Sequence, residues 1–167
     1  MASPFVFAPA QLEDLDRLVA IEQQSFTAPW TRRMFEAEFQ NPFSRLFAAR
    51  LTSEGRPGFI VGYLCWWVVF EEVRLMNLAV EAGRRRQGIA KALVLQALSA
   101  AQTEGAERAV LEVRASNLPA VRLYEELGFR HVAVRAQYYT DPIEDAVLMQ
   151  RNSVRVLTLS QEVKHAD

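Results

Sequence analysis

The feature of this sequence that most constrains its fold is an apolar run at residues 75–80, followed by an arginine-rich turn and a long alanine- and leucine-rich pattern. This order predicts a strand, a loop and then a helix that starts at Gly88. The first turn of a helix has unpaired N–H groups and the positive end of the helix dipole, so it can bind an anion such as a phosphate. Gly88 lets the backbone approach closely, and the small Ala90 leaves room for the bound group.

Two common phosphate-binding motifs do not occur in the chain. There is no P-loop sequence ending in Gly-Lys-Ser/Thr, and no G-x-G-x-x-G turn followed by the acidic residue of a dinucleotide-binding fold. What remains is R-x-x-G-x-A, from Arg85 to Ala90, directly after a strand. That pattern also suits a purely structural loop, so its interpretation depends on the residues downstream.

Composition favours one ordinary globular domain. The chain has 167 residues, 50% of them hydrophobic, and a formal net charge of −1. Neither disorder nor a surface that coats nucleic acid is indicated, and we expect no direct nucleic-acid partner. A single cysteine, Cys65, excludes an intrachain disulfide and a clustered zinc site, and with only two histidines we expect no metal.

Two further features bear on location. The longest apolar run, residues 59–70, is too short to cross a membrane and contains Gly62. The N-terminal sequence MASPFVFAPA lacks the basic segment of a signal peptide. We therefore expect a cytoplasmic protein without a membrane partner.

Hydrophobic periodicity predicts an α/β fold with a mixed sheet. A second helix, after the first, is capped by Thr31 and stopped at Asn41. The other predicted helices cover residues 11–26, 88–103 and 117–127, and the predicted strands cover residues 5–8, 46–51, 59–70, 75–80, 109–113, 129–139 and 145–149. We expect residues 1–150 to form one domain. Residues 151–167 form a C-terminal extension without an assigned role, either an added edge strand or a loosely docked segment.

Glu112 lies in the middle of an apolar strand, AVLEVR, where a glutamate faces either solvent or a cleft. Asn117 follows at a helix start, and Tyr124 lies seven residues further, on the same stripe of that helix. A carboxylate, an amide and a phenol can therefore surround one cleft beside the anion-binding turn. This requires the side chains of Glu112 and Tyr124 to lie on the same side of the sheet, around one cleft. Taken alone, Tyr124 also fits a core tyrosine with a wet hydroxyl.

The segments RRRQGIAKAL, LEVRASNLPAVRLYEELGF and YYTD followed by EDAVLM occur in this order, after Ala28-Pro29-Trp30-Thr31. Together they resemble the GNAT family of N-acetyltransferases, and within it the bacterial ribosomal-protein-alanine N-acetyltransferases (RimI type). The resemblance covers residues 11–149. It implies a single GNAT-like domain with a mixed central sheet of about six to seven strands flanked by about four helices.

The resemblance also implies acetyl-CoA as cosubstrate and assigns roles to individual residues. Glu112 matches the family's general base and Tyr124 its general acid. The residues that match coenzyme contacts are Leu78, Ala79, Val80, Arg85, Arg86, Gln87, Gly88, Ile89, Ala90, Lys91 and Asn117.

The implied chemistry needs an acid and a base. A peptide N-terminal amine has a pKa of about 8 and must lose a proton before it attacks a thioester. Glu112, through a water, can take that proton, and the Tyr124 phenol can protonate the leaving thiolate. Backbone N–H groups near residues 78–80 can polarise the thioester carbonyl. We expect direct transfer in a ternary complex, because Cys65, the only possible acyl-cysteine carrier, fits a buried structural thiol better.

On the acceptor side, the resemblance implies that Trp30, Tyr138 and Tyr139 border a groove for an extended N-terminal peptide; alternatively these aromatics pack the sheet edge. Negative potential suited to a basic peptide can come from Glu71, Glu72, Glu125, Glu126, Asp141, Glu144 and Asp145. The expected function is acetylation of the N-terminal alanine of a ribosomal protein. The alternatives are an acetyltransferase for a small amine or a lysine side chain, and a non-catalytic acyl-CoA-binding module.

Overall fold

The protein folds around one seven-stranded sheet. The structure, a computed structural model, describes residues 4–53 and 56–156. The strands are β1 (Phe5–Pro9), β2 (Ser44–Ser53), β3 (Arg56–Val69), β4 (Glu72–Val80), β5 (Arg108–Arg114), β6 (Arg130–Tyr139) and β7 (Glu144–Arg151). The helices are α1 (Leu15–Ser25), α2 (Arg32–Gln40), α3 (Ile89–Thr103) and α4 (Leu118–Glu126), with short 3-10 turns η1 (Leu12–Asp14) and η2 (Ala82–Arg84).

The strands are arranged in the order β1-β2-β3-β4-β5-β7-β6. Neighbouring strands are antiparallel except for β4 and β5, which are parallel and are connected through α3. The predicted α/β fold with a mixed sheet is therefore confirmed, and so is the predicted order of helices and strands. Near-continuous apolarity in β3 is explained by its place inside the sheet, where Val61, Leu64 and Trp66 are fully buried.

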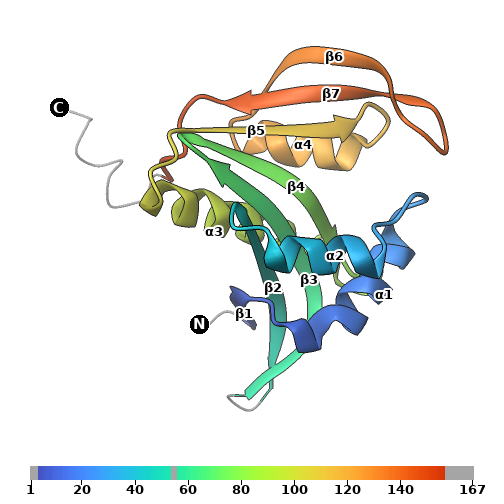
Figure 1. The fold of residues 1–167 in the computed structure, drawn as a ribbon, viewed down its shortest axis with the longest axis vertical. Coiled ribbons are helices and arrows are strands. Elements are labelled where there is room, and N and C mark those ends of the chain that lie inside the picture. The colour runs from blue at the N-terminus through green and yellow to red at the C-terminus, as the bar shows by residue number, and fades with distance from the viewer. Residues whose placement is uncertain (1–3, 54–55, 157–167) are drawn as a thin grey trace.

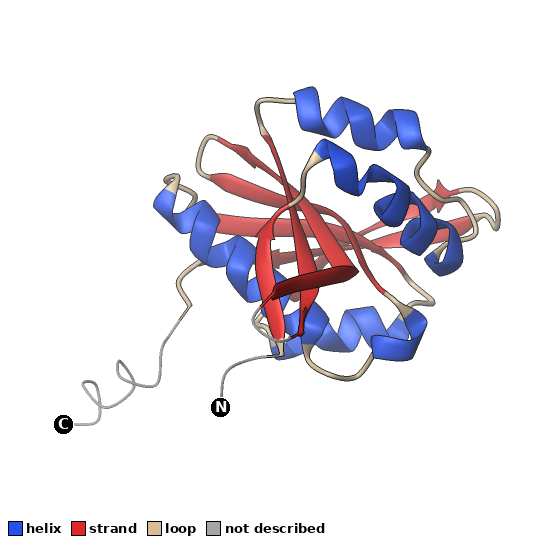
Figure 2. Ribbon diagram, turned by 90° about the horizontal axis from the view of Figure 1, so that it is seen from below, coloured by secondary structure: helices blue, strands red, loops and turns tan. Residues whose placement is uncertain are grey.

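Helices cover both faces of the sheet (Figure 2). On one face α1 and α2 pack through a core that includes Leu18, Ile21 and Phe35. On the other face α3 and α4 pack through a larger core that includes Leu93 and Val121. Each strand of the centre therefore alternates between two cores, and a residue's place in the strand decides which core it joins.

The sheet opens between β4 and β5. Their pairing runs only from Glu72 opposite Arg108 to Leu75 opposite Leu111. Immediately afterwards β4 has a bulge. Leu75 pairs with Trp66 and Asn77 pairs with the adjacent Cys65, so Met76 is an extra residue without a partner in β3. Beyond this point the two strands diverge, as Figure 1 shows.

The observed helix starts agree with the predicted ones in two places and differ in one. Thr31 caps α2 by accepting a hydrogen bond from the amide of Met34 at 3.3 Å. Asn117 caps α4 by accepting one from the amide of Ala120, also at 3.3 Å. The prediction of a single helix from residue 11 was wrong, because η1 comes first and α1 starts at Leu15.

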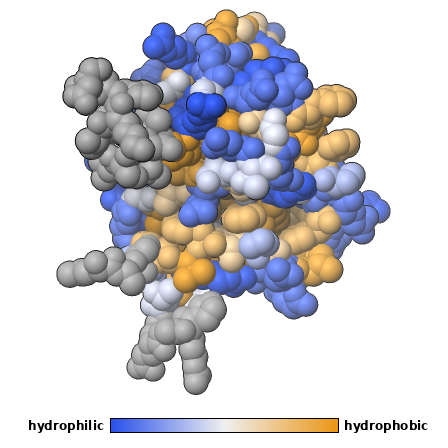
Figure 3. Space-filling model, turned by 90° about the vertical axis from the view of Figure 1, so that its left-hand side faces the viewer, coloured by the Kyte–Doolittle hydropathy of each residue, from blue (hydrophilic) through white to orange (hydrophobic). Residues whose placement is uncertain are grey.

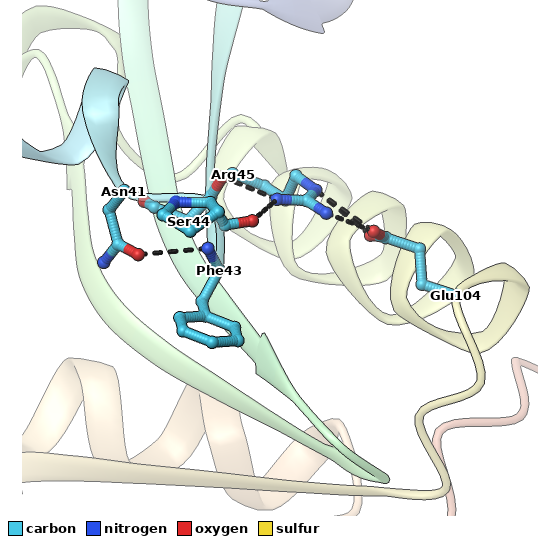
Figure 4. Close-up of polar contacts among 6 residues, drawn as sticks. Asn41, Phe43, Ser44, Arg45 and Glu104 are labelled. Carbon is cyan, nitrogen blue, oxygen red and sulfur yellow. Dashed lines mark hydrogen bonds and ion pairs between the residues drawn. The ribbon is translucent and has the colours of Figure 1, made fainter.

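The start of β2 is tied to the end of α3 (Figure 4). The Arg45 guanidinium donates to the carbonyls of Pro42 at 2.8 Å and Ser44 at 2.9 Å, and pairs with the Glu104 carboxylate. Asn41 accepts a hydrogen bond from the amide of Phe43 at 3.0 Å. These contacts fix the connection between α2 and β2 against the end of α3, the helix that begins at the predicted anion-binding turn.

The chain after β7 does not continue as a strand within the described residues. Val154 is 2% exposed and joins the α3 core, and its amide donates to the carbonyl of Glu107 at 3.0 Å. Residues 152–156 are therefore docked rather than paired as an edge strand, and the rest of the predicted extension lies outside the described residues.

The surface shown in Figure 3 carries polar and apolar side chains interspersed. Of the helices in the described part of the chain, none combines the length and apolarity that a bilayer crossing demands. Across residues 4–53 and 56–156, no three His, Cys, Asp or Glu side chains cluster where they could hold a metal ion.

Candidate active site

A cavity of about 510 Å³ occupies the gap between the diverging ends of β4 and β5. A second cavity of about 340 Å³ shares part of the same wall. The residues that line both are Trp30, Leu75, Met76, Glu112, Tyr138 and Tyr139. Tyr124, Asn117 and Leu78 line the larger one. The opening of the sheet therefore brings together residues that the sequence singled out from five separate segments.

Glu112 and Tyr124 approach this cavity from opposite faces of the sheet, so the expectation that their side chains lie on the same side of the sheet was wrong. Leu111 and Val113 on β5 belong to the α3/α4 core, so the alternation of the strand turns Glu112 toward the face of α1 and α2. Tyr124 comes from α4, on the other face. In a closed sheet these two side chains would be separated. They line one cavity because it passes through the sheet where β4 and β5 have parted.

The Glu112 carboxylate is held between two arginines. Its Oε1 lies 3.6 Å from Arg74 Nη1 and 3.5 Å from Arg135 Nη1, and its side chain is 15% exposed. Of the two sequence interpretations, the cleft is correct and the solvated strand face is wrong. A carboxylate at a cavity wall is positioned to accept a proton from a bound amine.

Tyr124 is a core residue that also lines the cavity. Its ring packs edge-to-face on Phe129 at 5.7 Å and is part of the α3/α4 core. Burial, together with the nearby Tyr139, raises the pKa of its phenol above the ordinary value. Among the described residues its hydroxyl has no hydrogen-bond partner, although it lines the cavity. A neutral phenol facing a cavity is positioned to donate a proton.

Two further tyrosines complete this wall. A hydrogen-bonding interaction with Glu112 raises the pKa of Tyr138, and burial next to Glu112 raises the pKa of Tyr139 to about 12. Their rings pack against each other at 5.0 Å, and the Arg114 guanidinium lies 4.4 Å above the Tyr139 ring. Both tyrosines are therefore neutral hydrogen-bonding groups at neutral pH.

The predicted anion-binding turn lies apart from the cavity, at the end of β4 and the start of α3. Gly88 is the residue before the helix and has φ +78°, in the left-handed region that favours glycine. Unlike α2 and α4, α3 has no side chain capping its first turn among the described residues. Arg85, Arg86, Gln87 and Lys91 are exposed around it. Uncapped amides with exposed cations fit a diphosphate.

One edge of β4 links this turn to the cavity. From Asn77 to Val80 the strand pairs with β3 on one side, while its pairing with β5 has already ended at Leu75. The edge that includes Leu78, Ala79 and Val80 therefore faces the gap. On the opposite wall Asn117 caps α4 with its side-chain oxygen and also lines the cavity.

Glu22, the one charged residue in the buried core of the described chain, was not predicted from the sequence. It is 1% exposed, lines the larger cavity and accepts hydrogen bonds from three different segments. The available signal was periodicity, since Glu22 follows Ile21 and lies seven residues after Leu15, on the apolar stripe of α1. A charged residue at such a position needs partners.

Arg114 was also missed as a structural residue. Its guanidinium donates to the carbonyls of Pro142 at 3.1 Å and Thr140 at 3.0 Å, and pairs with Glu144 at 3.5 Å. It therefore holds the loop between β6 and β7 beside the cavity. That loop also meets the segment between α1 and α2, because Thr27 Oγ1 donates to the carbonyl of Asp141 at 2.7 Å.

The acidic residues expected to attract a basic peptide are largely engaged elsewhere. Glu72 pairs with both Arg74 and Arg108, and Glu144 pairs with Arg114. The charged side chains beside Glu112 in the smaller cavity are Arg74 and Arg135. The charge around the cavity therefore gives no support for a basic acceptor.

Cys65 is a buried free thiol, as predicted. Burial raises its pKa to about 12, and its Sγ lies 3.4 Å from the hydroxyl of Ser44. At neutral pH it is protonated, and a thiol rather than a thiolate is a poor nucleophile.

Comparisons with known proteins agree with this geometry. The model of the acetyltransferase (GNAT) family matches residues 15–129. A protein of Bacillus subtilis (strain 168), named putative ribosomal protein bS18-alanine N-acetyltransferase, is 35% identical over 140 residues, covering 83% of this chain and 89% of that protein. The crystal structure of the ribosomal-protein-S18-alanine N-acetyltransferase from Escherichia coli has a TM-score of 0.79 at 30% identity, covering 93% of this chain and 97% of that one.

A more distant structure, Arabidopsis thaliana NAA60 in complex with acetyl-CoA, has the same fold, with a TM-score of 0.79 at 23% identity, covering 87% of this chain and 97% of that one. The chain belongs to the acetyltransferase (GNAT) family and is an enzyme, an N-acetyltransferase. Within that family it is similar over most of its length to the ribosomal protein bS18-alanine N-acetyltransferases, as the sequence resemblance indicated.

Proposed function

We propose that this enzyme transfers the acetyl group of acetyl-CoA directly to the N-terminal amine of an alanine on ribosomal protein bS18. The observation that carries the proposal is the single cavity, between the diverging ends of β4 and β5, that Glu112 and Tyr124 both line. The acceptor comes from the similarity to the bS18-alanine N-acetyltransferases described above. A ribosomal acceptor also implies that the enzyme acts in the cytoplasm.

Acetyl-CoA would bind along the edge that connects the turn to the cavity. Residues 86–91 would hold the diphosphate with the uncapped first-turn amides of α3, supported by Arg85 and Arg86. The free edge of β4 at Leu78, Ala79 and Val80 would pair with the pantetheine arm. Asn117, which lines the cavity from the other wall, would supply one further contact.

Glu112 and Tyr124 would supply the base and the acid. Glu112, through a water, accepts a proton from the acceptor amine, whose nitrogen then forms a bond to the acetyl carbonyl carbon. As the carbon–sulfur bond breaks, the Tyr124 hydroxyl donates a proton to the leaving thiolate. The raised pKa of Tyr124 means that the phenol carries this proton at neutral pH. Backbone amides near Leu78 would polarise the carbonyl.

Direct transfer fits the state of the only cysteine. An acyl-enzyme route would need a reactive thiolate, and burial, together with the nearby Glu38, raises the pKa of Cys65 and keeps its thiol protonated. Cys65 is also not among the residues that line either cavity.

The acceptor peptide would enter beside Trp30, Tyr138 and Tyr139, which line both cavities. An extended chain passing these aromatics would place its terminal amine next to Glu112. The two loops that Thr27 and Asp141 join would form the far side of this entrance.

The test is a CoA-release assay with purified protein and a panel of acceptors. We expect turnover with a peptide that carries the N-terminal sequence of bS18, and none when its N-terminal amine is already acetylated. Polyamines and a peptide whose only free amine is a lysine side chain should react far more slowly. Preferred turnover of either of those acceptors would contradict the proposed substrate, and acetyl-CoA binding without CoA release on any acceptor would contradict the proposed reaction.

A further inference from the structure

Glu22, in the last turn of α1, is the one buried charged side chain of the described chain, and it accepts three hydrogen bonds. Its Oε1 accepts a hydrogen bond from the backbone amide of Trp30 at 2.8 Å. Its Oε2 accepts one from the side-chain amide of Asn77 at 2.9 Å and another from the hydroxyl of Tyr63. One carboxylate therefore joins the segment between α1 and α2 to strands β3 and β4.

The two segments that Glu22 joins lie on different sides of the proposed reaction. Trp30 belongs to the stretch whose residues Phe26, Thr27 and Ala28 also line the cavity on the acceptor side. Asn77 lies in β4 directly after the bulge and directly before Leu78, on the edge assigned to acetyl-CoA. A shift of Glu22 would therefore move the acceptor wall relative to the coenzyme edge.

We propose that Glu22 is a positioning residue, which sets the place of the acceptor-binding segment against β4 and so determines how well the acceptor binds. This inference rests on the function proposed above. The aromatic contacts support it, because the Trp30 ring packs on Phe35 at 5.4 Å and Phe35 packs on Tyr63 at 5.5 Å. The Trp30 side chain is thus held by the same group of residues that surrounds the carboxylate.

A carboxylate is required here because all three partners are donors. An ionised glutamate has acceptors only, which matches a backbone amide, a side-chain amide and a phenol. In Glu22→Gln one end of the side chain becomes a donor. If that donor faces Trp30, the backbone amide of Trp30 loses its acceptor. If it faces β4, the side-chain amide of Asn77 must turn over and the Tyr63 hydroxyl must accept instead of donate.

The variant Glu22→Gln tests the proposal by steady-state kinetics in which acceptor peptide and acetyl-CoA are varied separately. We expect the KM of the peptide to rise about tenfold or more, the change expected for a lost hydrogen bond to a charged group. The KM of acetyl-CoA should change little, because its proposed contacts on α3 are untouched. Glu22→Asp, which keeps the charge but shortens the side chain, should show the same separation if Glu22→Gln does not fold.

The matched control is Glu38→Gln. Glu38 is a half-buried carboxylate on the neighbouring helix α2, and it accepts a hydrogen bond from Trp67 Nε1 at 2.8 Å. It does not line either cavity. This control should keep both KM values of the wild type. If Glu22→Gln raised both KM values equally, or left both unchanged, Glu22 would be only a stabilising residue and the proposal would be overturned.

Hydrogen exchange, measured by mass spectrometry without any acceptor, separates this proposal from the proposed function. Relative to wild type, Glu22→Gln should speed exchange in residues 26–31, because the hydrogen bonds that tie this segment to β4 through residue 22 are lost or rearranged. Exchange in β5 should stay the same. If wild type failed to acetylate any peptide, the proposed function would fail while this comparison would still decide the role of Glu22. Unchanged exchange in residues 26–31 would overturn it.

Discussion

The role proposed for Glu112 depends on its surroundings as well as on its place in the strand. A glutamate in an apolar strand is unusual, and the sequence alone allowed its side chain to face either solvent or a cleft. The structure puts its Oε1 within 3.6 Å of Arg74 and 3.5 Å of Arg135 at a cavity wall. Both arginines are substantially exposed, so each ion pair contributes little to stability. Their effect is to orient the carboxylate.

Tyr124 combines a packing role with a proposed chemical role, and Tyr124→Phe separates the two. The ring, with its edge contact to Phe129, stays in place while the proton donor is lost. We expect kcat to fall by about a hundredfold or more, the typical contribution of one acid–base group, while thermal stability stays close to wild type. Calorimetric titration should show unchanged acetyl-CoA affinity. If Tyr124→Phe kept the kcat of the wild type, or if its acetyl-CoA affinity fell as much as its kcat, Tyr124 would not be the general acid.

Glu22 also predicts a dependence of stability on pH. Burial raises its pKa above the ordinary value of 4.5. Between pH 4.5 and that raised value, the unfolded chain has lost the proton while the folded chain still holds it. Folding therefore binds a proton, and the contribution of this group to the free energy of unfolding falls as pH rises through that interval.

Urea denaturation of wild type and Glu22→Gln across this interval measures the effect. The difference in free energy of unfolding between the two should change with pH, with wild type losing stability relative to the variant as pH rises. A difference that is constant with pH would mean that Glu22 has an unshifted pKa in the folded protein.

At the scale of helices and strands, much of the architecture could be predicted. Local sequence patterns were enough to predict the order of helices and strands and the turn before α3. They also predicted the helix caps at Thr31 and Asn117. The beginning of α1 could not be predicted as well. Residues 11–14 form their own reciprocal bonds, in which the amide of Gln11 donates to Asp14 at 2.7 Å, and this holds η1 as a separate turn.

The start of α3 gives a prediction at this scale. Gly88 has φ +78°, and an added Cβ would meet nothing within 4 Å, so Gly88→Ala introduces backbone strain without a clash. Strain of this kind costs about 1 kcal/mol. Because the strained turn presents the proposed diphosphate amides, acetyl-CoA affinity should fall as well, as calorimetric titration would show.

Gly105→Ala is the control for this substitution. Gly105 follows the opposite end of α3, has φ +94° and is equally unobstructed. It should lose a similar amount of stability and keep wild-type acetyl-CoA affinity. If both variants lost affinity equally, the turn at Gly88 would have no special part in binding.

At the scale of the whole molecule, the decisive feature is the parting of β4 from β5. The sequence nominated Glu112, Asn117 and Tyr124, but nothing in its periodicity shows that parallel pairing ends at Leu75 or that Met76 is the extra residue of a bulge. Those features depend on how the sheet packs between its two hydrophobic cores. Without the opening, Glu112 and Tyr124 would remain on opposite faces.

Glu112→Gln measures most directly whether transfer takes place in that opening. The substitution keeps the shape of the side chain and removes its ability to accept a proton. At neutral pH we expect turnover of an N-terminal alanine peptide to fall about a hundredfold or more, the typical contribution of a general base, with acetyl-CoA affinity unchanged. Turnover close to wild type would contradict the assignment of the base and, with it, the placing of the reaction between β4 and β5.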